Sequence, residues 1–500
     1  MHTELVAAVD LGSNSFRLQV GRIVNDQIYP LDGLKEPVRL AAGLGDNKIL
    51  DEASQARGLL ALARFGERLA EFQPHRVRAV ATNTLRVAKN APEFIAKAEA
   101  ALGFPIEVIA GREEARLIYV GVAHTLPEPH RQQLVVDIGG GSTEFIIGKS
   151  FQPIELESLY MGCVSYTLRY FPNDRIKRRG FDDAQLAARR ELEAIADAYR
   201  REGWELAIGS SGTAKSLRDI LVANGLSERG ITRSGLEELK QVLIANGSLD
   251  KLGLKGIKAD RLPVLPGGLA IMMSIFDAFG LEAMEFSDGA LRLGVLYDLL
   301  GRYHHHDLRD ATVDAFADRY RVDRKQADQV AATATWLLEQ LEPETRDPDN
   351  LERRFLQWAA TLHEVGISVA HSSYHKHSAY ILANADMPGF SRMDQGRLAR
   401  LVLGHRGKLA RLSDIDPDSP DWLSIVCLRL AVVFHRARTE RSRPPIAIER
   451  VGPGFSLTAN ADWLGELPLT AAALNDEVAQ WNAIGHPLQL TVPGADNPER

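Results

Sequence analysis

Two stretches of the chain read alike: LVVDIGGGSTEFIIG at residues 134–148 and AVDLGSNSFRLQVG at residues 8–21. A shift of 127 residues (137 − 10) superposes identical pairs, which are Val9/Val136, Asp10/Asp137, Gly12/Gly139, Ser15/Ser142 and Gly21/Gly148. Each copy has an apolar run ending in Asp, a loop of small residues and a second strand-like run, which is typical of a strand–loop–strand unit. The common register indicates a repeated structural device.

Strand and helix patterns alternate around both copies. Residues 25–26 (Asn-Asp) predict a turn, residues 52–72 carry a helical apolar stripe, and residues 77–82 read as a strand. A helix over about 92–102 and a strand over 106–109 follow. After the second copy, strand-like segments recur at LAIGSSGT (206–213) and AMEFSDGA (283–290). This alternation predicts two α/β domains.

After about residue 300 the pattern becomes mostly helical, with few strand candidates before FSLTA near residue 455. His304, His305 and His306 are most simply a solvated linker. The predicted domains are an α/β domain at 1–125, a second at 126–302, a helical domain at 303–435 and a small C-terminal α+β domain at 436–500.

The composition is that of an ordinary globular protein, with 45% hydrophobic and 25% charged residues among 500. A net charge of −7 gives no indication of a nucleic-acid polymer or a membrane as partner, and no apolar run of the roughly 18 residues of a membrane helix stands out. The two cysteines, Cys163 and Cys427, fit a reducing compartment, and the first residues lack a signal-peptide pattern. We therefore expect a cytoplasmic protein.

The repeated loops are suited to phosphate. Gly and Ser bring backbone N–H groups close to a ligand, and hydroxyls such as Ser13 and Ser142 add donors. Asp10 and Asp137 would repel phosphate, so we expect them to hold a divalent cation or its water shell. The alternative for either copy alone is a tight hairpin without a ligand. Glu144 lies seven residues after Asp137 and could add a carboxylate to the metal site, although a single strand Glu is more often solvated.

A third loop, GSSGTAKS at residues 209–216, follows an apolar run and begins a helix. It is not a P-loop, because Ala214 replaces the last glycine, so it predicts only an anion site at a helix N-terminus. In ATNTLR, Arg86 could bind phosphate or form a salt bridge. In AGREEARL, Glu113 and Glu114 lie about 100° apart on a helix, so at most one can face a cleft.

Taken in order, VDLGSNS, GREEARL, VDIGGGSTE, GSSGT and SDGALR resemble the exopolyphosphatase / guanosine pentaphosphate phosphohydrolase family over essentially the whole chain. The resemblance implies two ribonuclease-H-like (actin-like) domains, then an α-helical HD-like domain and the small C-terminal domain. It implies a Mg²⁺ ion and leaves open whether K⁺ stimulates. It also implies a homodimer.

The resemblance assigns Glu114 as the catalytic residue that orients water, and Asp137 and Glu144 as the residues that hold the metal and that water. With Asp10, these form the expected metal site. The expected phosphate-binding residues are Ser13, Asn14, Ser15, Arg86, Gly139, Gly140, Gly141, Ser142, Gly209, Ser211 and Gly212.

The helical domain departs from the HD signature, because Glu364 in LHEVG stands where a metal-binding Asp belongs. That departure makes a second metal centre doubtful. We expect the nearby histidines to be structural or to touch substrate; they are His371, His375, His377 and His405. Three basic segments could guide a polyanion or be solvated faces: residues 175–179, the residues Arg397, Arg400, Arg406, Lys408 and Arg411, and residues 436–443.

The leading hypothesis is an exopolyphosphatase that releases terminal phosphate from inorganic polyphosphate. The alternative within the family is hydrolysis of guanosine pentaphosphate, or both activities. Two more distant alternatives are an ATP-dependent kinase, which needs an acceptor site, and an actin-like filament or nucleotide-sensing scaffold, for which Glu114 would be dispensable.

Overall fold

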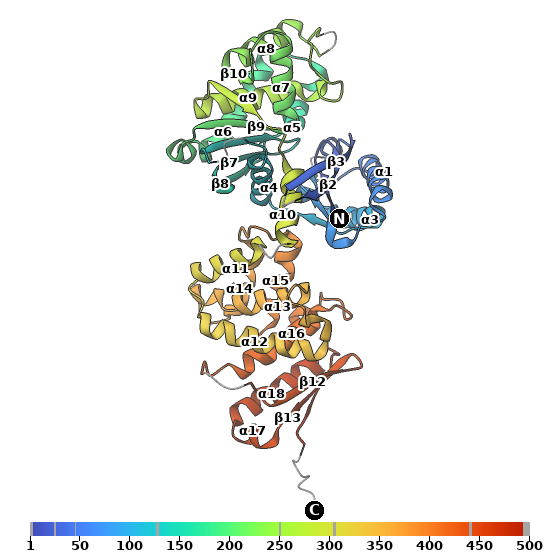
Figure 1. Ribbon diagram of the computed structural model, residues 1–500, viewed down its shortest axis with the longest axis vertical. Coiled ribbons are helices and arrows are strands. Elements are labelled where there is room, and N and C mark those ends of the chain that lie inside the picture. Colours follow the sequence, from blue (N-terminus) through green and yellow to red (C-terminus); the bar gives the residue numbers. More distant parts are fainter. Residues whose placement is uncertain are drawn as a thin grey trace, which may run out of the picture. The chain divides into compact units, whose positions relative to one another are not determined.

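The computed structural model describes residues 4–24, 27–45, 47–126, 130–249, 252–303, 307–439 and 443–493, without the side chains of residues 302 and 303. The chain divides into two compact units, residues 1–307 and 308–500 (Figure 1). The turn predicted at residues 25–26 and the linker predicted at His304, His305 and His306 lie outside the described residues. The boundaries predicted near residues 125 and 435 fall inside these units and stay predictions.

The first sheet of unit 1 is built on the first copy of the repeat. Its strands lie in the order β3-β2-β1-β4-β5. Their bounds are Glu4–Leu11 (β1), Phe16–Val24 (β2), Gln27–Glu36 (β3), Val77–Ala81 (β4) and Ile106–Val108 (β5). Helices α1 (Glu52–Leu69) and α3 (Ala91–Leu102) bury Leu62, Phe65 and Phe94 against one face of this sheet. The predicted alternation of strands and helices is confirmed.

The second sheet repeats this arrangement around the second copy, in the order β10-β11-β9-β6-β7-β8. Its strands are Gln133–Ile138 (β6), Thr143–Lys149 (β7), Gln152–Leu159 (β8), Leu206–Ser210 (β9), Ile231–Thr232 (β10) and Ala283–Phe286 (β11). Asp10 pairs with Arg17 across the first hairpin, and Asp137 pairs with Glu144 across the second. A parallel strand then lies beside β1 and beside β6. The predicted duplication is confirmed.

Helices α4 (Gly111–Ala123) and α10 (Leu291–Tyr303) lie between the two sheets. Successive strand residues face opposite sides of a sheet, so Val6 and Ala8 of β1 reach these helices while Val9 faces α1 and α3. Val135 and Ile146 of the second sheet contact the same α4–α10 core. One shared core therefore fixes the two sheets relative to each other.

The outer face of the second sheet carries the remaining helices of unit 1. They are α5 (Cys163–Tyr170), α6 (Arg178–Glu202), α7 (Ser211–Ala223), α8 (Arg233–Asn246) and α9 (Leu265–Phe279); the short α2 (Asn83–Val87) follows β4. Within the described chain, Leu262–Phe279 alone is long and apolar enough for a membrane span, with mean hydropathy 1.6. It is 72% buried in the fold and serves as a core helix.

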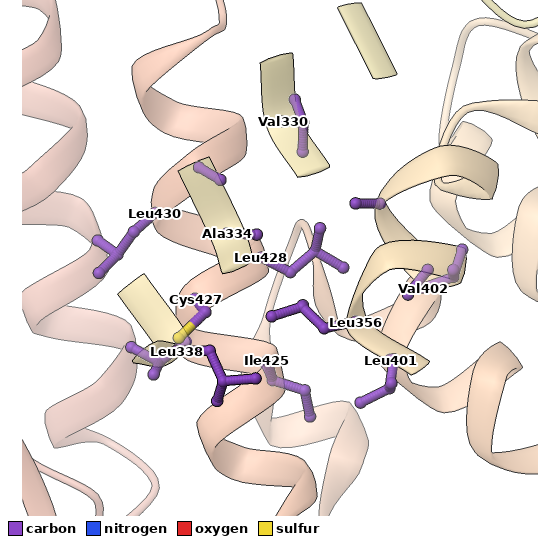
Figure 2. Packing of buried hydrophobic residues seen from close by; sticks show 14 of the residues in the cluster. Val330, Ala334, Leu338, Leu356, Leu401, Val402, Ile425, Cys427, Leu428 and Leu430 are labelled. Atoms are coloured by element: carbon purple, nitrogen blue, oxygen red, sulfur yellow. The ribbon is translucent and has the colours of Figure 1, made fainter. Parts of the chain in front are cut away.

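Unit 2 is helical, with a small sheet near its C-terminus. Its helices are α11 (Leu308–Arg319), α12 (Arg324–Leu341), α13 (Leu351–Leu362), α14 (Tyr374–Asn384), α15 (Arg392–Gly404), α16 (Asp421–Phe434), α17 (Ala461–Gly465) and α18 (Pro468–Asn482). Its strands are β12 (Ile446–Val451), β13 (Gly454–Ala459) and β14 (Leu488–Thr491). Figure 2 shows the packing of Ala334, Leu356 and Cys427 in the core, which continues into the small sheet. The predicted fold class is confirmed for both units.

Candidate active site

A cavity of about 190 Å³ in unit 1 lies between the two repeated hairpins. Its lining comes from the first hairpin (Asp10, Gly12, Ser13, Asn14, Ser15, Arg17), the second hairpin (Asp137, Ile138, Gly139, Gly140, Ser142, Glu144), the third loop (Ser211, Gly212, Lys215) and Thr82, Glu114, Ile118, Arg261, Phe286, Ser287, Asp288, Ala290, Leu291 and Arg292. The structure thus brings together most of the residues predicted from sequence. Of those predicted residues, all of which it describes, Arg86, Gly141 and Gly209 are not in the lining.

The two repeated loops touch each other, and glycine allows the contact. A Cβ atom at Gly140 would lie 3.0 Å from Cβ of Ser13, and one at Gly141 would lie 2.5 Å from Oδ1 of Asn83. Thr84 donates a hydrogen bond from Oγ1 to Oγ of Ser13 at 2.8 Å, which links the first loop to the residues after β4. Gly141 therefore acts by allowing close packing beside the cavity.

Glu114 faces the cavity from the first turn of α4, and Glu113 does not. Glu113 is buried and bonded to Arg116 on the same helix. The prediction that at most one of the pair faces a cleft is confirmed. Arg86 lies behind Glu114, where its Nη1 donates to Oε2 of Glu114 at 3.1 Å and to the carbonyl of Ile109 at 3.0 Å. Arg86 thus forms a buried salt bridge with the catalytic candidate, which is neither a surface pair nor a position in the lining of the cavity.

Four carboxyl groups of the cavity, those of Asp10, Glu114, Asp137 and Glu144, have a raised pKa because burial disfavours their charged form. Burial raises the pKa of Glu114 to about 7, although Arg86 acts in the opposite direction. Burial also raises the pKa of Asp10 to about 6, opposed by Arg292 and Arg17. The pKa of Asp137 is raised by burial against hydrogen bonds from Ser211 and Ser210. Such a cluster is stable when a proton or a cation neutralises it.

Glu144 is buried rather than solvated, so the sequence expectation for a single strand glutamate does not hold here. It lies opposite Asp137 in the hairpin, and Ser158 on β8 donates from Oγ to its Oε1 at 2.8 Å. Burial, and then the neighbouring charges of Glu114 and Asp137, raise its pKa well above the ordinary value. The repeat places this carboxylate where the first copy has Arg17, so the two hairpins carry opposite charges at equivalent positions.

These carboxylates fit a magnesium ion that retains water. In the described part of the chain, no group of three or more His, Cys, Asp or Glu side chains converges as a ready ligand set. Mg²⁺ is usually held by one or two carboxylates, several waters and the phosphates of a substrate. The oxygen donors of Asp10, Asp137 and Glu144 match that preference.

The third loop, at residues 209–216, has a strained backbone and lies close to a guanidinium group. Ser211, which begins α7, has a φ of 67°, in the left-handed region that is unfavourable for a side chain. A Cβ atom at Gly212 would lie 2.1 Å from Nη2 of Arg261, so only glycine lets that guanidinium lie over the loop. Gly209 lies one residue before the end of β9 and packs against Met284. Strained backbone of this kind is common at ligand sites.

The cavity also contains cations that the sequence analysis did not single out. They are Arg17, Lys215, Arg261 and Arg292. Arg17 occupies the position of the first copy that is equivalent to Glu144 in the second, and Arg292 belongs to the motif SDGALR. Burial, and then the charge of Arg292, lower the pKa of Arg17 to about 10, so the site favours an anion between these guanidinium groups.

In the histidine-rich region of unit 2, the described residues include no group of three His, Cys, Asp or Glu side chains that could hold a metal ion. Glu364 is paired with Arg438, and His375 contacts Arg411 through Nε2 at 3.2 Å. His405 and His375 are buried, whereas His371 is exposed and His377 is half-buried. The expectation that these histidines are structural or touch substrate stays a prediction.

The predicted basic segments are partly neutralised. In unit 2, Arg397 bonds Asp421 at 2.7 Å, and Arg400 lies 3.6 Å from the same carboxylate. In unit 1, Arg179 lies 3.6 Å from Asp183 on α6. Residues 440–442 of the third segment lie outside the described residues. A role for these segments in guiding a polyanion stays a prediction.

Comparison with known proteins supports the fold. The model of the Ppx/GppA phosphatase family matches residues 19–303, and that of Ppx/GppA phosphatase domain III matches residues 308–478. An exopolyphosphatase crystal structure from Cytophaga hutchinsonii is 25% identical, with a TM-score of 0.54, over 59% of this chain and 98% of its own. An exopolyphosphatase-like protein is also 25% identical, with a TM-score of 0.54, over 60% of this chain and 98% of its own.

A Ppx/GppA family member from Aquifex aeolicus is similar in fold, at 24% identity and a TM-score of 0.51, over 61% of this chain and 99% of its own. These solved structures each match about three fifths of the chain. The first family model alone covers more than half of the 500 residues. The chain belongs to the Ppx/GppA phosphatase family.

Proposed function

We propose that this protein is an exopolyphosphatase, which hydrolyses the terminal phosphate of inorganic polyphosphate with Glu114 as general base. The observation that carries the proposal is the position of Glu114. Its carboxylate has a pKa raised to about 7 by burial and lines a cavity whose other walls are glycine loops and guanidinium groups. A base with a pKa near the working pH is both available and strong enough to take a proton from water.

Different residues of the site accept the proton, orient the base and bind the phosphate. Glu114 accepts the proton of the attacking water, and Arg86 orients its carboxylate at 3.1 Å. The loops around Ser13 and Gly140 offer N–H and O–H donors, and Arg17, Arg261 and Arg292 balance charge on the phosphate oxygens. A Mg²⁺ ion held by one or two of the carboxylates of Asp10, Asp137 and Glu144, together with water and substrate oxygens, would neutralise part of that charge.

The chemistry of the cavity favours a phosphate chain as substrate. Beside the loops lie the cations Arg17, Lys215, Arg261 and Arg292, whose side chains suit the oxygens of a phosphate chain. The exopolyphosphatase from Cytophaga hutchinsonii, at 25% identity, supports the same choice. Two buried, unpaired cysteines support a location in the reducing cytoplasm. We also propose a homodimer.

Guanosine pentaphosphate is the second candidate, because an aromatic ring also borders the cavity. Phe286 lines it, and Arg218 lies over this ring at 4.5 Å from its centre. An aromatic ring beside cations can contact a nucleobase while the loops hold its phosphates. The same hydrolytic residues would then remove the terminal phosphate of the nucleotide.

The test is phosphate release by the full chain, with Mg²⁺ or with EDTA, from long-chain polyphosphate and from guanosine pentaphosphate side by side. We expect faster, Mg²⁺-dependent release from polyphosphate. Release mainly from the nucleotide would transfer the assignment to the second candidate. Release from neither, combined with ATP turnover that a small acceptor stimulates, would replace the proposal by a kinase.

A further inference from the structure

A buried network of ion pairs lies on the side of α4 that faces away from the cavity. Arg116 donates from Nε and Nη2 to the two oxygens of Glu113, both at 2.8 Å, and from Nη2 to Oδ1 of Asp298 at 2.5 Å. Arg78 donates from Nη1 to Oδ2 of Asp298 at 2.6 Å and is paired with Glu107 at 3.0 Å. The Arg78 and Arg116 side chains are only 2% and 7% exposed.

The network joins the helices that carry site residues. Glu113 and Arg116 belong to α4, directly beside Glu114, and Asp298 belongs to α10, which also carries Arg292. Arg78 anchors both helices to β4 of the first sheet. The parts of the site from opposite sides of the cavity are therefore connected through this network.

The two helices also touch through their backbones. A Cβ atom at Gly294 of α10 would lie 1.7 Å from the carbonyl oxygen of Leu117, and one at Gly121 of α4 would lie 2.3 Å from the carbonyl oxygen of Ala290. Close contact fixes the distance between the helices but leaves rotation of α4 about its axis to be determined by side chains. The bidentate bond of Arg116 is well suited to determine it, because its planar fork fixes direction as well as distance.

We propose that the buried network of Arg78, Glu113, Arg116 and Asp298 is a positioning device that fixes the rotation of α4 and so holds Glu114 at the cavity. The inference rests on the proposed function, in which Glu114 is the base. Adjacent helix residues point about 100° apart, so the network and the base occupy separate faces of one helix turn. A rotation of about 10°, at the radius of about 6 Å that side chains reach, moves a carboxylate by about 1 Å.

The energetics agree with positioning more than with stabilisation. A buried ion pair contributes little beyond what well-packed apolar side chains of the same size would provide, because both charges lose their water. Burial disfavours the charged form of Arg116, yet Asp298 and Glu113 more than offset this effect and raise its pKa. The network thus keeps Arg116 charged and its bonds are directional, at a place where apolar packing would have sufficed for stability.

The experiment compares the full-length wild type with Asp298→Asn, Arg116→Lys and, as control, Arg112→Gln. Arg112 lies on the same helix turn but forms an exposed pair with Glu157 at 3.2 Å, outside the network. Asp298→Asn removes one charge without changing shape, and Arg116→Lys keeps the charge but loses the fork. Phosphate release from polyphosphate with Mg²⁺ gives kcat and KM, and crystal structures give the position of Glu114.

We expect kcat to fall about 10- to 100-fold for Asp298→Asn with KM changed less than about threefold, because a misplacement of about 1 Å is worth up to about 100-fold in rate. Arg116→Lys, which keeps the charge but loses the fork, should also lower kcat, by less than Asp298→Asn does, and Arg112→Gln should match wild type. The structure of Asp298→Asn should show α4 rotated and the Glu114–Arg86 contact lengthened from 3.1 Å.

Folded variants with wild-type kcat, or with α4 and the Glu114–Arg86 contact unchanged, would overturn the proposal. If Asp298→Asn does not fold, the same comparison is made with Arg116→Lys, which retains the buried charge. If wild type releases no phosphate from either substrate, the proposed function fails, and the position of Glu114 in the two crystal structures still decides for or against the positioning device.

Discussion

Replacing Glu114 by glutamine should remove a specific pH dependence of stability. The folded protein raises the pKa of this carboxyl from 4.5 to about 7 through burial. A group with a raised folded pKa binds more protons in the folded state, so its stabilising contribution is complete below pH 4.5 and is lost as the pH rises through 7. Wild type, kept free of divalent cations, should therefore become less stable as the pH rises, and Glu114→Gln should lack this part of the loss.

The pKa values set the size of the effect. A shift from 4.5 to about 7 corresponds to about 3 kcal/mol of unfolding free energy, at about 1.4 kcal/mol per pH unit. Most of this falls between pH 5 and pH 8 by the same relation. Glu144 shares the sign of the effect, and it loses a neighbouring charge in the variant, so the measured difference should be no smaller.

Urea unfolding of wild type and Glu114→Gln in EDTA, at intervals between pH 5 and pH 8, measures this difference. Glu193→Gln, at an exposed position of α6, is the matched control and should follow wild type at every pH. A wild-type minus variant difference that stays constant across the range would refute the raised pKa of Glu114, and with it the reason for its role as a base at neutral pH.

Three further results are expected. Gly294→Ala should lower the free energy of unfolding by about 1–3 kcal/mol, because the new methyl group meets the carbonyl oxygen of Leu117, whereas Gly465→Ala, which has open space in α17, should be nearly neutral in the same denaturation assay. Arg292→Gln should weaken inhibition by free phosphate in a competition assay, since it removes a cavity cation, whereas exposed Arg22→Gln should not. Addition of Mg²⁺ to metal-free protein should raise its melting temperature more at pH 8 than at pH 5, because protons compete with the cation for the cavity carboxylates; an equal shift at both pH values would contradict this.

The internal repeat explains why so much of the fold and the site could be predicted. Asp10 and Asp137 end equivalent buried strands, and period-two alternation defines the strands around them, so their meeting at one cavity follows from local patterns. Glu114 lies outside the repeat. Helix geometry alone could say that one of Glu113 and Glu114 faces a cleft, but the choice between them came from the family resemblance.

The other features of the site depend on contacts between segments far apart in the chain, which local sequence patterns do not predict. Arg261 lies almost fifty residues after Gly212, in a segment without a recognisable motif, and only the folded chain places its guanidinium against that loop. The burial of Glu144 likewise requires β8 and the α4–α10 core. Arg86 was expected at the phosphate, and the structure places it behind Glu114, because the carbonyl of Ile109 also binds its guanidinium.

The measurement that tests the account most directly is the turnover of long-chain polyphosphate by wild type, Glu114→Gln and the exposed control Glu193→Gln, with Mg²⁺ present. Removal of a general base is worth about 100-fold or more in rate, and the isosteric amide keeps the shape of the cavity. The account predicts that kcat falls by at least about 100-fold for Glu114→Gln, with KM little changed and the control unaffected. Turnover by Glu114→Gln within a few-fold of wild type would contradict the assignment of the base, and with it the proposed mechanism.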